Sequence, residues 1–286
     1  MNKFTGVFIF LIILGLTSCS TAPKNNGDIN VLRRSAEKGL DSANKEAGQG
    51  KFANAQNLLT EYKRMAVLAD DPSLIIRICL SFGNVFLSLG RINEAYAEWD
   101  QAVAEAQKLG DKELLSVTKI FRARGNLLLE RASAQSVLDE VNGEIANIKT
   151  NKLYIAYSWQ TKGLAQRALG SYREAEDSIK KSLEIHEKEK SLENASFDWY
   201  TVASVRSMAG NASGALQALE SAIKIDRRIE NSFGLAANWR AVGDIYRKMG
   251  KNDDALEAYK RSRAIFEALG NRDEVTAIDA RMKGNF

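Results

Sequence analysis

The sequence predicts an all-α protein in which helical hairpins stack side by side into a solenoid. The first observation is a repeat, because Gly50, Gly90, Gly170, Gly210 and Gly250 are separated by 40, 80, 40 and 40 residues, and an alanine follows each of them by five residues. A fixed period of about 20–50 residues is typical of stacked supersecondary units. The second observation is that the 286 residues include only two prolines. This favours long helices, because proline interrupts their backbone hydrogen bonds.

The first 18 residues, 1–18, have the form of an export signal. Lys3 precedes an almost wholly apolar stretch at residues 4–16, which is shorter than the roughly 20 residues that a helix needs to cross a membrane. Residues 16–19 read Leu-Thr-Ser-Cys and resemble the lipobox of bacterial lipoproteins, whose cysteine receives lipid and becomes the first residue of the mature chain. Cys19 would then anchor the protein to a membrane. The alternative is an ordinary secretory signal that ends near a cysteine.

The residues after Cys19 indicate a tether and a destination. Residues 19–30 are mostly polar and include Pro23 and Gly27, so we expect a flexible tether. Ser20 stands where lipoproteins retained in the inner membrane carry aspartate, and this resemblance implies the outer membrane. Cleavage would leave 39 basic and 36 acidic residues, a net charge of +3, which gives no electrostatic case for a nucleic-acid partner.

Each of six 40-residue units between residues 31 and 270 is expected to be a helical hairpin. In the last unit Trp239 and Ile245 lie on one face of a helix. Gly250 then ends that helix, because glycine readily adopts the left-handed backbone conformation. Ala255 is small enough for a point where two helices cross closely.

The third unit and the C-terminal end depart from this pattern. Glu130 and Gln135 stand where the other units have glycine and alanine, so the third hairpin is predicted to be degenerate. Residues 271–282 are predicted to form a final helix with a polar outer face, which would cover the apolar surface of the last hairpin as terminal caps do.

The last unit resembles a tetratricopeptide repeat (TPR), and the second, fourth and fifth units match in part. The residues that carry the resemblance in the last unit are Trp239, Gly243, Tyr246, Gly250, Ala255 and Tyr259. The units are 40 residues long where the family's standard length is 34, which makes this a long-repeat variant. The resemblance covers residues 31–286 and implies a right-handed superhelical solenoid of about six hairpins plus a C-terminal capping helix.

The sequence offers no catalytic or metal-binding constellation, and we expect neither an enzyme nor a cofactor. No phosphate-binding loop and no nucleophile motif occurs. His186 is the only histidine and lies in a charged helical segment, so a solvated position is expected. Trp159, Trp199 and Trp239 are predicted to fill the hairpin cores, and Cys79, at the same repeat position, is predicted to be a core residue.

The resemblance implies a binding groove on the concave face that is formed by the first helix of each hairpin. Arginines and aromatic residues on these helices are typical of surfaces that hold peptides. The alternative is that some of the aromatic side chains pack between repeats. The predicted groove residues are Arg77, Asn84, Tyr157, Gln160, Arg167, Phe197, Tyr200, Arg240, Asp244 and Arg247.

These expectations together describe a protein-interaction scaffold of the bacterial cell envelope. It would be lipid-anchored through Cys19, on the outer membrane facing the periplasm or the cell surface, and would bind an envelope protein or peptide in the groove. A component of an envelope transport system that binds a small molecule or lipid is the alternative, although Arg167, Arg240 and Arg247 argue against the apolar lining that it needs. The exposed helix faces leave open whether copies of the chain form a homo-oligomer.

Overall fold

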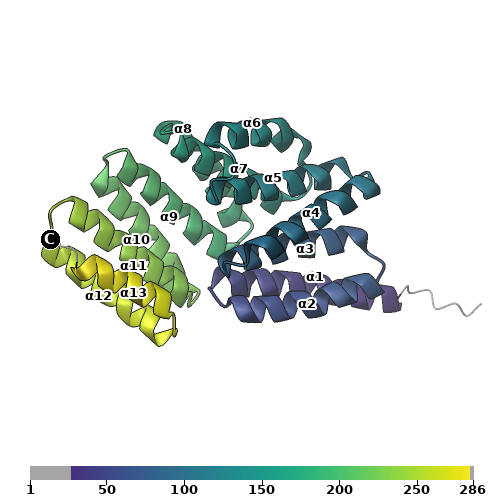
Figure 1. Ribbon diagram of the computed structural model, residues 1–286, viewed down its shortest axis with the longest axis horizontal. Coiled ribbons are helices and arrows are strands. Elements are labelled where there is room, and N and C mark those ends of the chain that lie inside the picture. The colour runs from purple at the N-terminus through teal and green to yellow at the C-terminus, as the bar shows by residue number, and fades with distance from the viewer. Residues whose placement is uncertain (1–26, 284–286) are drawn as a thin grey trace, which may run out of the picture.

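The structure, a computed structural model, describes residues 27–283 and contains only helices within that range (Figure 1). The predicted signal at residues 1–18 and the Cys19 site lie outside the described residues. The expected tether at residues 19–30 is described only from Gly27, where the first helix begins. The helices are α1 (Gly27–Gly48), α2 (Phe52–Leu68), α3 (Pro72–Ser88), α4 (Ile92–Leu109), α5 (Lys112–Leu128), α6 (Ala134–Glu144), the 3₁₀ helix η1 (Ile145–Asn147), α7 (Lys152–Ala168), α8 (Tyr172–Lys188), α9 (Leu192–Met208), α10 (Ala212–Arg228), α11 (Ser232–Lys248), α12 (Asn252–Ala268) and α13 (Arg272–Lys283).

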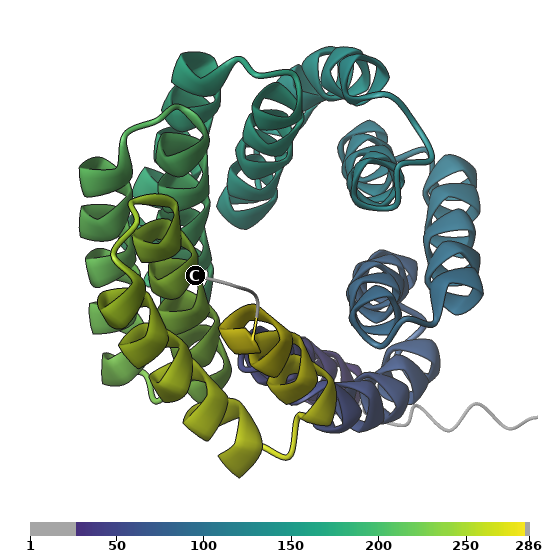
Figure 2. The same cartoon turned by 60° about the vertical axis from the view of Figure 1, so that its left-hand side comes forward.

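Consecutive helices pair into hairpins, in the order α1–α2, α3–α4, α5–α6, α7–α8, α9–α10 and α11–α12, and α13 packs on α12. The odd-numbered helices from α1 to α11 are called the inner helices here, because they face the centre of the curved stack in Figure 2, and the even-numbered ones are the outer helices. The predicted all-α solenoid of about six hairpins with a capping helix is confirmed. No helix among the described residues has both the length and the apolar character to cross a bilayer.

The turns within the hairpins are set by residues with a left-handed backbone. Gly250 has a φ of 72°, and the amide of Lys251 donates back to the carbonyl of Tyr246 at 3.0 Å, which closes the end of α11. This is the Schellman type of helix end that glycine favours. The same place in the third hairpin holds Glu130 with a φ of 53°, a conformation that costs a residue with a Cβ more than it costs glycine.

The helices of a hairpin cross so closely that glycine is required on one side. A Cβ at Gly83 of α3 would lie 2.0 Å from Nε1 of Trp99, whose side chain is completely buried. A Cβ at Gly243 of α11 would lie 2.6 Å from the Tyr259 ring. Gly243 and Tyr259 both belong to the repeat pattern of the sequence. In the structure, the Tyr259 ring fills the space beside Gly243 in the sixth hairpin, as Trp99 does beside Gly83 in the second.

The repeated tryptophans do not fill the hairpin cores, and that prediction was wrong. Trp159, Trp199 and Trp239 are only half-buried. Trp199 and Trp239 pack against the edge of the hydrophobic core, and Nζ of Lys181 lies 4.1 Å from the centre of the Trp159 ring. A cation over an indole face adds a modest attraction there. Cys79, at the same repeat position, is completely buried as predicted.

The third hairpin is degenerate, as the sequence predicts. Its second helix, α6, has 11 residues, whereas α4 has 18 and α8 has 17. It begins four residues after Glu130, at Ala134, whereas α8 begins two residues after Gly170. Gln135 is exposed instead of lying at the helix crossing, and the chain returns to α7 through η1 and a short loop.

The curved stack brings the first hairpin back to the fifth and sixth. The ring of Phe52 in α2 meets the ring of Phe233 in α11 edge-on, with centroids 5.9 Å apart. A Cβ at Gly50 would lie 2.5 Å from the Phe233 ring, and one at Gly48 would lie 3.2 Å from Cβ of Glu193 in α9. Figure 2 shows the resulting ring of helices, with the inner helices facing one another across the centre.

Candidate functional site

The first part of the predicted groove is filled by the protein's own side chains. Tyr157 of α7 lies flat on Phe121 of α5, with ring centroids 4.0 Å apart and planes at 12°. The guanidinium of Arg124 lies 4.6 Å from the centre of the Tyr157 ring. Burial raises the pKa of the Tyr157 hydroxyl, and Asn84 of α3 lies near enough to oppose that rise. Tyr157 and Phe121 thus link inner helices of two different hairpins.

Arg77 takes part in a second link across the concave face. Its charge lies near the hydroxyl of Tyr154 of α7, whose pKa is raised by burial, and near the carboxylate of Asp41 of α1. Burial raises the pKa of Asp41 and the charge of Arg77 opposes that rise. Nε of Arg77 is buried with no hydrogen-bond partner in the described chain. The predicted aromatic contacts between repeats are therefore present in this half of the concave face.

Gln160 belongs to a buried polar network that was not predicted from the sequence. Its side-chain oxygen accepts from Arg124, and its amide donates to Asp198 Oδ1 at 2.6 Å. The other oxygen of Asp198 lies 2.6 Å from Nδ1 of His186 and accepts from Ser182 at 2.9 Å. His186 is only 3% exposed, so the prediction of a solvated histidine was wrong. Its carboxylate partner comes from the next hairpin, which compensates the histidine for its loss of water.

The same two repeat positions form another polar pair one hairpin later. Asp226 and Asn238 lie 40 residues after His186 and Asp198, and Nδ2 of Asn238 donates to Asp226 Oδ2 at 2.7 Å. Burial raises the pKa of Asp226 to about 6. The 12-residue spacing inside both pairs was the sequence signal that could have revealed them.

The second part of the predicted groove is more open and combines aromatic and basic side chains. The aromatic–arginine patch is defined here as Arg124, Arg167, Phe197, Tyr200 and Arg240. Phe197 is 41% exposed and stacks against Tyr200 with centroids 6.1 Å apart, while Arg124 lies 5.7 Å from the centre of the Phe197 ring. Arg240 forms an ion pair with Glu274 of α13 and lies near Tyr200.

The two remaining predicted groove residues lie at the C-terminal end of α11. Asp244 accepts a hydrogen bond of 2.7 Å from the Tyr259 hydroxyl and forms an ion pair of 3.3 Å with Arg281 of α13. Arg247 is exposed. Asp244 is thus engaged in holding α12 and the capping helix against α11.

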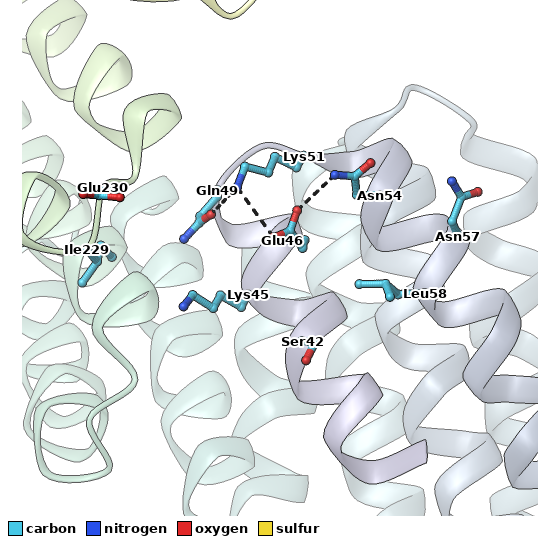
Figure 3. Close-up of a pocket in the computed structure, with 10 residues that line it drawn as sticks. All are labelled: Ser42, Lys45, Glu46, Gln49, Lys51, Asn54, Asn57, Leu58, Ile229 and Glu230. Carbon is cyan, nitrogen blue, oxygen red and sulfur yellow. Dashed lines mark hydrogen bonds and ion pairs between the residues drawn. The ribbon is translucent and has the colours of Figure 1, made fainter. Parts of the chain in front are cut away.

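Two cavities lie at the junctions of the stack. One of about 680 Å³ is lined by residues of α1, α2 and the turn between them, and by Ile229 and Glu230 of the α10–α11 turn. Figure 3 shows Lys45 and Gln49 on one side of it and Glu230 on the other, while Lys51 bonds to Gln49 at 2.8 Å. A smaller one of about 350 Å³ lies at the third hairpin. Nowhere in residues 27–283 are three or more His, Cys, Asp or Glu side chains grouped to hold a metal ion.

Comparison with known proteins identifies the repeats. Tetratricopeptide repeat models match residues 156–189 and 195–268. A search of curated proteins found no match to the chain.

Solved structures share the fold at low sequence identity. BtubC from P. vanneervenii is 16% identical with a TM-score of 0.56, and the match covers 82% of this chain and 92% of that one. A Rap protein complexed with competence and sporulation factor is 14% identical with a TM-score of 0.59, covering 89% and 77%. PlcR of Bacillus thuringiensis, in complex with the peptide PapR7 and DNA, is 17% identical with a TM-score of 0.57, covering 77% and 82%. The chain therefore contains tetratricopeptide repeats at residues 156–189 and 195–268, within a helical solenoid of the TPR type.

Proposed function

We propose that this protein is an interaction scaffold that holds a protein or peptide partner against the aromatic–arginine patch. The observation that carries this proposal is the exposure of Phe197, a large apolar side chain that is 41% exposed on the concave face beside an arginine. Exposed aromatic side chains and arginines are enriched where proteins bind partners. Among the structures with the same fold, PlcR is a complex that includes the peptide PapR7, and the Rap protein is complexed with competence and sporulation factor, which agrees with this use.

The charges of the patch favour an acidic partner. It contains three guanidinium groups, and Glu274 is the carboxylate that pairs with one of them, Arg240. Arginine binds carboxylates through paired hydrogen bonds, and a rigid stack of helices presents these groups without a large ordering cost. A segment with acidic side chains and an apolar anchor for Phe197 and Tyr200 fits this surface.

The patch can be tested by crosslinking the protein in envelopes of its own cells and recovering it with its partner. Tyr200→Ala and Arg240→Ala each remove a central contact, and loss of such a contact typically weakens binding by 2 kcal/mol or more, roughly 30-fold. Tyr172→Ala removes an aromatic side chain from the outer helix α8 and is the matched control. Equal recovery of the partner by wild type and all three variants would refute the location.

We further propose that the scaffold is tethered to the bacterial cell envelope by lipid on Cys19. The support is the Leu-Thr-Ser-Cys sequence after a short apolar segment, together with the general rule that two or more acyl chains hold a protein stably on a bilayer. Metabolic labelling with palmitate should mark the wild type and not Cys19→Ala. Labelling that persists in Cys19→Ala would contradict the anchor site.

A further inference from the structure

The cavity at the third hairpin has a mostly apolar lining with one charged residue of each sign. Its volume is about 350 Å³, at the lower end of the range for ligand pockets. Arg167 lies at the cavity together with Glu130, which is exposed. The apolar lining residues are Leu127, Leu128, Ala132, Ala134, Leu164 and Ala168.

The cavity exists because the third hairpin departs from the repeat. The start of the second helix is shifted by two residues, because α6 begins late, at Ala134; Gln135 is therefore exposed, and Val137 is the buried residue where the other hairpins have alanine. The first turn of α6 therefore lies beside the C-terminal ends of α5 and α7 without filling the space between them. Leu128, an apolar side chain that is 50% exposed, is left at its edge.

Arg167 is a half-buried cation without a carboxylate partner among the described residues. Its one hydrogen bond there is the 3.0 Å bond that it donates to the Ser204 hydroxyl, although a guanidinium has five N–H donors. Burial lowers the pKa of Arg167, which reflects the cost of removing a charge from water without pairing it. Arg206 of α9, by contrast, pairs with Glu176 at 2.8 Å.

The cavity is continuous with the patch described above. Leu164 and Arg167 of α7 occupy the repeat positions that Ser204 and Ser207 occupy in α9, and the bond from Arg167 to Ser204 joins the cavity's edge to the helix that carries Phe197 and Tyr200. A segment lying on the concave face can therefore pass from the patch over Arg167 and place a side chain in the cavity.

We propose that this cavity receives an aliphatic side chain of the partner, and that Arg167 pairs with an acidic side chain next to it in the partner's sequence. The inference rests on the proposed scaffold function. It means that the degenerate hairpin recognises a Leu-Asp or Leu-Glu dipeptide in the partner's sequence. The missing carboxylate partner of Arg167 argues for the acid, and the apolar lining argues for the aliphatic neighbour. We expect this pair of residues to lie within the partner's chain and not at its C-terminal end, because the concave face continues beyond Arg167.

The test uses small probes on the full chain, with binding followed by calorimetry or ligand-observed NMR. N-acetyl-Leu-Asp-amide should bind with a Kd on the order of 0.1–1 mM, as expected for about 20 non-hydrogen atoms. N-acetyl-Leu-Asn-amide has the same shape without the charge and should bind at least about tenfold more weakly. N-acetyl-leucine and octanoate carry a carboxylate at a chain end and should also bind more weakly than the aspartate probe.

Three variants locate the binding. Arg167→Gln should remove the difference between the aspartate and asparagine probes, and Ala134→Leu should weaken both by filling the cavity. Arg228→Gln removes a charge from the outer helix α10 and should behave as the wild type. Circular dichroism confirms that each variant is folded, and Arg167→Gln tests the charge independently of the cavity.

Several results would overturn the inference. The first two are equal binding of the aspartate and asparagine probes, and binding that Ala134→Leu leaves unchanged. The others are binding of N-acetyl-leucine or octanoate that is tighter than that of the aspartate probe, and no binding of the aspartate probe at 10 mM, about tenfold above the weakest expected Kd. Failure of the scaffold function is a separate result. Tyr200→Ala that loses the crosslinked partner while Arg167→Gln keeps it would overturn this inference alone, whereas full recovery by Tyr200→Ala would count against the patch itself.

Discussion

Replacing Asp226 by asparagine should stabilise the protein at neutral pH. The carboxylate is 1% exposed and accepts from Asn231 and Asn238 at 2.9 and 2.7 Å. The nearby Ser196 hydroxyl favours the charge of Asp226, and the carboxylate of Glu193 disfavours it. The variant can keep the network, because Oδ1 of Asn238 is buried without a partner in the described chain and could accept from the new amide after a flip.

The magnitude follows from the pKa of Asp226, which burial raises from 3.8 to about 6. The folded state holds the proton of Asp226 more tightly than the unfolded state, so the contribution of Asp226 to the free energy of unfolding falls as pH rises from 3.8 to about 6 and is constant above that. A rise of about two pKa units corresponds to a loss of roughly 3 kcal/mol in the free energy of unfolding once Asp226 is ionised. Loss of a charged hydrogen bond in the variant costs about 1.5 kcal/mol. Asp226→Asn should therefore gain about 1–2 kcal/mol at pH 7.5 and little at pH 4.5.

The assay is urea unfolding followed by circular dichroism at 222 nm between pH 4.5 and 7.5. About 2 kcal/mol of the wild type's loss of stability over this range should be absent from Asp226→Asn. Asp253→Asn, which removes an exposed carboxylate in the first turn of α12, should keep the wild-type slope. Parallel pH profiles for wild type and Asp226→Asn would refute the reasoning that burial of this carboxylate is costly.

Three further changes probe other contacts. Gly83→Ala should lower the free energy of unfolding by about 1–3 kcal/mol and the melting temperature by several degrees, because its Cβ would overlap Trp99; an unchanged thermal transition would contradict this. In Cys19→Ala, the Cys79 thiol, whose pKa burial raises to about 12, should react with a disulfide reagent only on unfolding, and fast reaction in native buffer would show it to be accessible. Phe52→Ala should increase hydrogen exchange in α1 and α2 and not in α12, because it removes the ring contact with Phe233. If α1 and α2 exchange at the same rate in Phe52→Ala and wild type, this contact does not hold the first hairpin in place.

The hairpins could be predicted from the sequence because their determinants are local and repeated. Gly250 and Ala255 mark a helix end and a close crossing within a few residues of one another, and the 40-residue period repeats this information in other units. The degenerate third hairpin was visible for the same reason, since Glu130 and Gln135 interrupt the period. What the interruption does, which is to leave a cavity beside Arg167, depends on how three helices pack and has no local signal.

The candidate site was predicted less completely, because it depends on contacts between units. The sequence places Gln160 and Tyr157 on the concave face, but their side chains are engaged by Asp198 and Phe121 from neighbouring hairpins. His186 was expected in solvent because the residues around it are charged, and its burial follows from a carboxylate one hairpin further along the chain. A one-dimensional pattern does not show which exposed-looking positions the next repeat covers.

Site-specific photo-crosslinking tests the central claim, that the concave patch holds a partner, most directly. A photoreactive phenylalanine analogue at position 197 should crosslink in living cells to a discrete partner, whereas the same analogue at position 172, on the outer helix α8, should not. Arg240→Ala should reduce the crosslink from position 197. Equal products from both positions, or none from position 197, would contradict the account.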